Sequence, residues 1–173
     1  MVSNYLIFLI SYFSIVLSVI GHGVLAIRLT KTNISIEEIG FVGLVGIFFL
    51  ILYSYVTHFF ISHGYLHNLI FIFIGLSSIY YFKSKIFLKK NSILLFSIFS
   101  VIFLAFVIFK THDDFGYYHF PYSYYINKFS MIIGIGPLNH GFKTPSSIFY
   151  LNSLFYLPYL EYHLYHMGAM LIL

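Results

Sequence analysis

The sequence lacks cysteine and tryptophan altogether, and it is poor in charge: 9 Lys and Arg and 5 Asp and Glu, or 8% of 173 residues. Without cysteine the chain has no disulfide, no thiolate metal site and no cysteine nucleophile. A soluble domain carries about 25% charged residues. The shortage of charge therefore excludes a soluble enzyme, a nucleic-acid-binding module and a disordered chain.

What the chain has in abundance is apolar: 60% of its residues are hydrophobic, 23% are aromatic, and its mean hydropathy is +0.92. A water-soluble globule of this size leaves roughly 30% of its surface exposed and cannot hide so much apolar area. The net charge of +4 is read as Lys and Arg that orient the chain in a membrane. The composition predicts an all-α, polytopic transmembrane helical bundle with a lipid bilayer as its partner and no nucleic acid.

Long stretches free of Asp, Glu, Lys and Arg predict the membrane spans, because a helix needs about 20 apolar residues to cross a bilayer. One such stretch is long enough for two helices, and its polar cluster Ser62–Asn68 predicts the turn between them. A signal peptide that is cleaved off begins with a positively charged region, and no charged side chain precedes the first span here. We therefore expect this span to remain part of the mature protein. We expect four helices, over about Asn4–Ile27, Ile39–Ile61, Tyr65–Phe82 and Ser92–Phe109.

Orientation follows from the rule that Lys and Arg gather in cytoplasmic loops. Arg28 and Lys31 follow the first span, and four lysines stand between the third and the fourth: Lys83, Lys85, Lys89 and Lys90. The segment after the fourth span is then extracytoplasmic. The expected division is 1–110 for four transmembrane helices, 111–160 for an extracytoplasmic loop with interfacial helices, and 161–173 for the start of a fifth transmembrane helix. Because that helix would end inside the bilayer, we expect the N-terminal portion of a longer protein.

The two Asp residues of the chain, Asp113 and Asp114, are adjacent and directly follow the fourth span. A carboxylate partly desolvated against aromatic rings is a better base near neutral pH. The flanking His112 and His119 can add nitrogen ligands or donors. His112, Asp113 and Asp114 are thus candidate ligands of a divalent cation. The alternative is that one Asp caps the next helix and marks the water boundary.

The next segment, Phe115–Phe129, holds eight aromatic residues. Tyrosine prefers the headgroup level of a bilayer, so we expect a helix lying in the membrane interface. Pro121 is expected to kink it or to start a second helical piece. The alternative is an aromatic belt with no ligand.

Glycine and proline make Gly134–Ser147 an irregular loop. Ser146 or Ser147 is expected to cap a helix over Ile148–Leu157. Lys143 and the free amides at that helix start predict a phosphate site. The alternative is a structural loop whose lysine meets lipid headgroups.

Histidines elsewhere admit two interpretations each. Glu161, His163 and His166 lie close together near the C-terminus and predict either a metal site or interfacial side chains. His22 and His58 lie within spans one and two, where polar residues are functional candidates. Haem ligation and interhelical hydrogen bonds are the alternatives for this pair.

The motifs Asp113–Pro121, Gly134–Phe142 and Ser146–Leu151 resemble an uncharacterised family of bacterial polytopic membrane proteins that is similar to the GT-C superfamily of glycosyltransferases. The resemblance implies transfer of a sugar from a polyprenyl-phosphate donor in envelope polysaccharide or glycolipid assembly. It implies Asp113 or Asp114 as the catalytic base, and substrate contacts from Tyr117, Tyr118, His119, Asn139, His140 and Lys143.

The resemblance also implies a bacterial inner membrane protein with its Asp-Asp loop outside the cytoplasm. One departure is that the acidic residue of GT-C enzymes follows the first span, whereas here it follows the fourth. Two other functions fit the sequence: a polysaccharide or lipid transporter, and a non-catalytic accessory subunit of a membrane complex.

Overall fold

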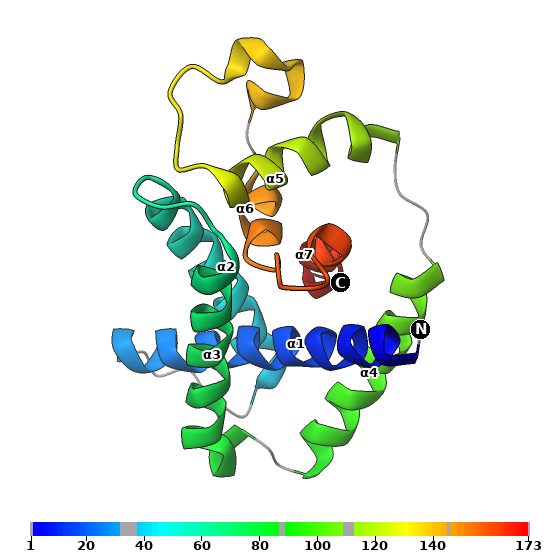
Figure 1. The fold of residues 1–173 in the computed structure, drawn as a ribbon. Coiled ribbons are helices and arrows are strands. Elements are labelled where there is room, and N and C mark those ends of the chain that lie inside the picture. Colours follow the sequence, from blue (N-terminus) through cyan, green and yellow to red (C-terminus); the bar gives the residue numbers. More distant parts are fainter. Residues whose placement is uncertain (1, 32–37, 87–88, 109–112, 145, 173) are drawn as a thin grey trace. The chain divides into compact units, whose positions relative to one another are not determined.

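The computed structural model describes residues 2–31, 38–86, 89–108, 113–144 and 146–172, and these residues are mainly helical with no strand among them (Figure 1). The four long helices are α1 (Val2–Thr30), α2 (Ile39–His58), α3 (Tyr65–Ile86) and α4 (Lys89–Ile108). They are followed by a π-helix, η1 (Phe115–His119), and by α5 (Phe120–Lys128), η2 (Gly136–Leu138), η3 (His140–Phe142), α6 (Ser147–Ser153), η4 (Tyr162–Leu164) and α7 (Met167–Ile172).

Three described helical stretches are long and apolar enough to cross a membrane: Tyr5–Thr30, Ile39–His58 and Tyr65–Phe82. By this criterion the chain is a membrane protein, as its composition predicts. The fourth expected helix exists as α4, but its apolar part, Ser92–Leu104, is shorter. That α4 crosses the membrane therefore stays a prediction. Helix α2 ends at His58 rather than at Ile61, because the chain turns at Phe59 and Phe60.

The described residues divide into two compact units, one from 1–50 and 71–109 with Ile172, and the other from 51–70 and 110–171. In the first unit, α1 meets α2 and α3 at glycines. A Cβ added to Gly21 would lie 1.9 Å from the carbonyl oxygen of Gly75, and one added to Gly46 would lie 2.1 Å from that of Val19. Small residues let membrane helices approach this closely and gain packing energy.

Polar and aromatic side chains complete the first unit. The hydroxyl of Tyr12 donates to the carbonyl of Phe99 on α4 at 2.9 Å. His22 places Nε2 3.0 Å from the carbonyl oxygen of Phe71 and stacks on the Phe71 ring. The interhelical hydrogen bond expected as one interpretation of His22 is thus confirmed.

The second unit is built around the apolar cluster of Tyr122, Ile126, Phe149 and Tyr150, which joins α5 to α6. Pro121 lies in the first turn of α5, so the expected second helical piece at this proline is confirmed. Helix α6 begins after Ser146, whose hydroxyl accepts from the amide of Ile148, as predicted.

The end of α6 differs from the prediction, at Ser153 rather than at Leu157. The chain already turns at Leu154 and Phe155, and Pro158 disfavours the α conformation at Leu157, the residue before it. A single bridge then joins Leu157 to Glu161 across a tight turn.

Candidate functional site

The acidic pair, Asp113 and Asp114, directly precedes η1 in the chain. Asp113 is exposed and Asp114 is half-buried. Asp114 occupies the N-cap position of η1, with helical backbone angles, and its side chain accepts no capping hydrogen bond. The side chain of Asp114 therefore does not cap η1, which contradicts the capping interpretation for this residue. Both carboxylates stand at the start of the aromatic segment, and His112 lies outside the described residues.

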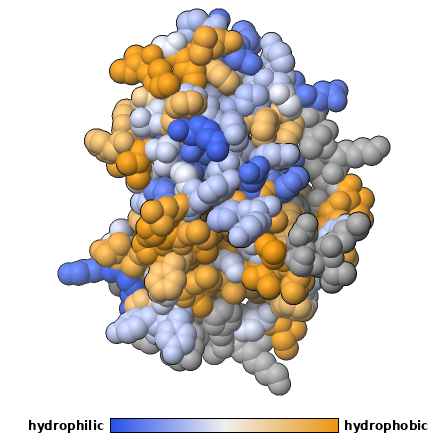
Figure 2. Space-filling model, in the orientation of Figure 1, coloured by the Kyte–Doolittle hydropathy of each residue, from blue (hydrophilic) through white to orange (hydrophobic). Residues whose placement is uncertain are grey.

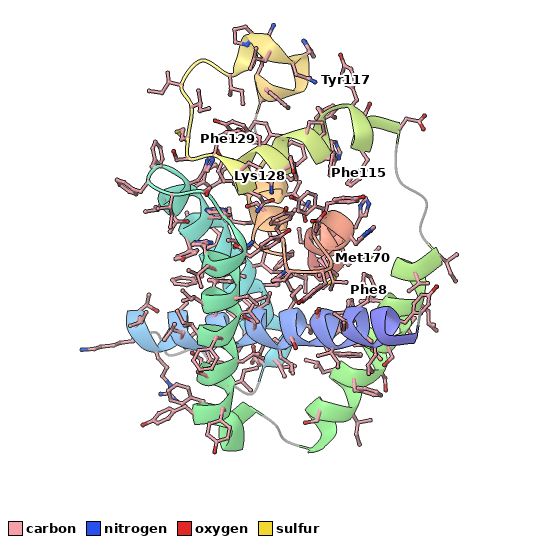
Figure 3. All side chains as sticks on the ribbon, in the orientation of Figure 1. Phe8, Phe115, Tyr117, Lys128, Phe129 and Met170 are labelled. Carbon is pink, nitrogen blue, oxygen red and sulfur yellow. The ribbon has the colours of Figure 1, made fainter. Side chains whose placement is uncertain are left out.

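Three of the predicted substrate residues lie on η1 itself. Tyr117 is exposed, while Tyr118 and His119 are half-buried. The ring of Tyr118 meets that of His119 edge to face, with centroids 4.4 Å apart, and His119 lies 5.0 Å from the ring of Phe149. The buried cluster of the second unit thus holds one side of η1, and its other side carries the exposed tyrosine (Figure 3).

The glycine- and proline-rich loop is fastened to η1 by Asn139. Pro121 has no N–H to give to the carbonyl of Tyr117, four residues earlier. The Nδ2 of Asn139 donates to that carbonyl instead, at 3.0 Å. The Oδ1 of the same side chain accepts from the amide of Gly141 at 2.9 Å. The structure therefore brings Asn139 to the backbone of Tyr117, as a positioning contact.

Gly141 permits a second close contact between the loop and η1. A Cβ at this position would lie 2.3 Å from Cγ of Tyr118, so no larger residue fits without movement. His140 and Lys143, the remaining predicted substrate residues, belong to the same loop and are exposed. The side chain of Lys143 folds beside Gly136.

The described residues offer no ligand set for a metal ion: no three His, Asp or Glu side chains among them are placed to share one. This finding contradicts the metal interpretation of Glu161, His163 and His166. Glu161 accepts instead from the hydroxyl of Tyr65 at 3.2 Å. The ring of His166 packs against Phe115 at 4.3 Å, where burial and the nearby His119 lower the pKa of His166. Because His112 is not described, its part in a cation site stays a prediction.

The second unit also contains a buried polar cluster, formed by His63, Asn68, Asn127 and Ser153. All four side chains are buried, each at most 3% exposed. Asn127 donates through Nδ2 to the carbonyls of His63 and Ser153, at 2.7 and 2.6 Å. Asn68 donates to the same two carbonyls at 3.0 and 2.8 Å. The hydroxyl of Tyr165 donates in turn to Oδ1 of Asn127.

The ring of His63 is held at both nitrogens. Nδ1 lies 2.7 Å from Oγ of Ser153, which donates its own proton to the carbonyl of Tyr150. Ser153 therefore accepts from Nδ1. Nε2 lies 3.0 Å from the hydroxyl oxygen of Thr57, which also donates to the carbonyl of Tyr53 at 2.9 Å. Burial, together with neighbouring His67 and His58, lowers the pKa of His63 to about 2. The ring is thus neutral, and its two nitrogens connect Thr57 to Ser153.

One sequence signal did point to this cluster. Ser62–Asn68 is the polar interruption between the second and third expected spans, and by itself it predicts only a turn. Asn68 lies within the apolar stretch Tyr65–Phe82, where an amide needs partners. Nothing in the sequence indicates that those partners come from residues near 127 and 153.

The fold and these contacts define an all-helical membrane protein in which a buried polar cluster supports an aromatic surface. Comparison with known proteins places it further. The chain belongs to a family of domains of unknown function (DUF8201), whose model matches residues 5–173. No curated protein and no solved structure matches the chain.

Proposed function

We propose that the chain provides the acidic site of a GT-C-like membrane glycosyltransferase, which transfers a sugar from a polyprenyl-phosphate donor. The sugar enters an envelope polysaccharide or glycolipid. The proposal places the protein in the bacterial inner membrane, with the Asp-Asp loop on the extracytoplasmic side and the η1–α5 segment in the interface. It rests on the sequence resemblance and on the arrangement around η1.

The observation that carries the proposal is the junction of Asp113 and Asp114 with η1. The carboxylates directly precede a helical turn that presents an exposed tyrosine ring, Tyr117. A carboxylate next to an aromatic face suits a sugar, because the ring stacks on the C–H face of a pyranose while the carboxylate takes a hydroxyl proton.

In the proposed reaction, Asp113 or Asp114 removes the proton from an acceptor hydroxyl. The hydroxyl oxygen forms a bond to the anomeric carbon of the sugar, and the bond from that carbon to the carrier phosphate breaks. The phosphate leaves with the electron pair, and the carboxylate keeps the proton. Lys143 and His140, both exposed on the neighbouring loop, are the side chains proposed to meet the departing phosphate, since cations and hydrogen-bond donors stabilise the charge that develops there.

The aromatic and polar side chains of η1 and of the loop that holds Asn139 have supporting roles in this proposal. Tyr117 and Tyr118 stack on the sugar or the prenyl chain, and His119 contacts the donor. Asn139 holds the loop against η1 and thereby sets the distance from the phosphate contacts to the carboxylates. A divalent cation, if bound, would have to use Asp113 and Asp114 together with groups outside the described residues, so no step is assigned to it.

The test is sugar transfer by the wild-type protein and by Asp113→Asn and Asp114→Asn, in membranes supplied with radiolabelled polyprenyl-phosphate glucose, galactose or mannose in turn. General-base catalysis contributes about 10²–10⁴-fold, so one of the two variants should lose at least about 100-fold in rate at an unchanged protein level. Glu38→Gln, which removes an exposed carboxylate elsewhere, should transfer normally. Wild-type rates in both Asp variants, or no transfer from any donor by the wild-type protein, would overturn the proposal.

A further inference from the structure

The loop that follows α5 exposes several large apolar side chains that no other part of the described structure covers. We define the 129–138 loop as the segment from Phe129 to Leu138. Its tip residue Ile133 is 96% exposed and Leu138 is 81% exposed, and Phe129 and Ile132 are exposed as well. Figure 2 shows hydrophobic atoms at the edge of the molecule where Figure 1 draws this loop. In water such a surface is unfavourable, so it indicates a partner.

The stem of the 129–138 loop is fixed rather than free. The amide of Met131 donates to the carbonyl of His58 at 2.9 Å, and Nε2 of His58 lies 3.1 Å from the carbonyl oxygen of Phe129. The hydroxyl of Tyr125 accepts from the amide of Ile132 at 2.7 Å and donates to the carbonyl of Ser130. These bonds tie the loop to the last residue of α2 and to Tyr125 of α5.

The position of His58 also indicates how deep the stem of the loop lies relative to the membrane. Ile39–His58 is long and apolar enough to span a bilayer, so His58 marks the end of a span. The three residues that follow, Phe59, Phe60 and Ile61, are exposed and apolar. Exposed Phe side chains at such a level bury their rings at the boundary between headgroups and acyl chains. The loop stem thus starts at the membrane surface, beside a second apolar group.

The charges of the surrounding segment fit a phospholipid surface. Residues 115–160 include two cations, Lys128 and Lys143, and no Asp or Glu. Both lysines are exposed, and lipid phosphates attract Lys near the membrane surface. Lys128 is also held in place, because its ammonium group donates to the hydroxyl of Tyr156 at 3.0 Å.

We propose that the 129–138 loop and Phe59–Ile61 form a membrane anchor, with Ile133 and Leu138 in the acyl region and Lys128 and Lys143 at the level of the lipid phosphates. The partner is the phospholipid bilayer, rather than a protein or a second copy of the chain. This inference does not depend on sugar transfer. The anchor would hold α5, and with it the aromatic surface of η1, at a fixed depth.

The absence of native cysteine allows a direct depth measurement. The variant Ile133→Cys carries a single thiol, which is labelled with a small environment-sensitive fluorophore after reconstitution into phosphatidylethanolamine–phosphatidylglycerol vesicles. Quenching is compared between iodide in the water and doxyl groups on the lipid chains. The control is Thr144→Cys, an exposed polar position after the same loop.

The anchor predicts that the label at position 133 is quenched at least about threefold more by lipid doxyl than the label at 144, and less by iodide. Equal iodide quenching at both positions would place the loop in water and overturn the proposal. Protection of position 133 from both quenchers would also overturn it, because a protein would then cover the loop. Since Ile133 makes so little contact, the substitution should leave the thermal midpoint in detergent unchanged.

Discussion

Nδ1 of His63 lies 2.7 Å from the hydroxyl oxygen of Ser153, although the two residues are 90 positions apart in the chain. His63 belongs to the turn between two spans, and Ser153 ends a short helix of the following segment. Two asparagines bind the backbone carbonyls of this same pair. The contact joins the membrane-spanning part of the second unit to the segment that carries the candidate site.

Asn127→Ala should strongly destabilise the protein. The substitution removes two donated hydrogen bonds and the acceptor for the buried hydroxyl of Tyr165. Asn68 still donates to both carbonyls in the variant, so the hydroxyl of Tyr165 is the group left without its partner. A buried polar group in that state costs about 1–3 kcal/mol, and we expect a loss of this size in the free energy of unfolding. Denaturant titration in detergent micelles measures this loss.

The matched control is Asn139→Ala, which also removes an amide that makes two hydrogen bonds. Asn139 is half-exposed, so water can replace its bonds, and the loss should stay below about 1 kcal/mol. Equal losses in the two variants would contradict the structural role assigned to the buried cluster.

Stability should fall in mild acid because of His63. Its folded pKa is about 2, against an ordinary value of 6.5, so the unfolded chain binds the extra proton between these two values. The contribution of His63 is then constant above about pH 6.5 and is lost as the pH falls below it, by up to about 1.4 kcal/mol per pH unit.

The His63→Gln variant isolates this effect. It lacks the titrating ring, so its stability should change less between pH 7 and pH 5 than that of the wild-type protein, even though it is less stable throughout. Unfolding midpoints at several pH values compare the two slopes, and the other histidines contribute to both. Parallel slopes would show that His63 is not buried as a neutral ring.

The fold was predictable where hydropathy alone decides it. Long apolar runs predicted α1, α2 and α3. The observed turn between α2 and α3, residues 59–64, overlaps the expected Ser62–Asn68 turn only in part, because α3 already begins at Tyr65. The end of α2 was predicted three residues late. Apolar residues continue to Ile61, and hydropathy does not register the chain reversal that the backbone of His58 stabilises by accepting from Met131.

The candidate site was predictable only locally. Pro121 and Ser146 indicated a helix start and a cap because such signals act within a few residues. The contact of Asn139 with Tyr117 spans 22 positions, and that of Asn127 with Ser153 spans 26. No short pattern encodes such a pairing. The cluster around His63 forms only through tertiary contacts, and in the sequence its members are polar residues far apart from one another.

Helix α2 offers a test of the glycine contacts in the first unit. Gly46→Leu should destabilise by at least about 2 kcal/mol, because its Cβ would meet the backbone of Val19 on α1 and overpacking is costly. Gly43→Leu adds the same apolar side chain to the same helix at a position with nothing within 4 Å, and it should be neutral. Unfolding in detergent compares them, and similar stabilities would refute the close approach of α1 and α2.

The most direct test of the central proposal is the side of the membrane on which η1 lies. Gly116→Cys introduces the only thiol, at an exposed position where a Cβ meets nothing within 4 Å. On intact cells, a membrane-impermeant maleimide should label this cysteine, whereas Glu38→Cys, in the loop after α1, should react only after the cells are opened. Labelling of Gly116→Cys only in opened cells would put the acidic pair in the cytoplasm and contradict the proposed transfer.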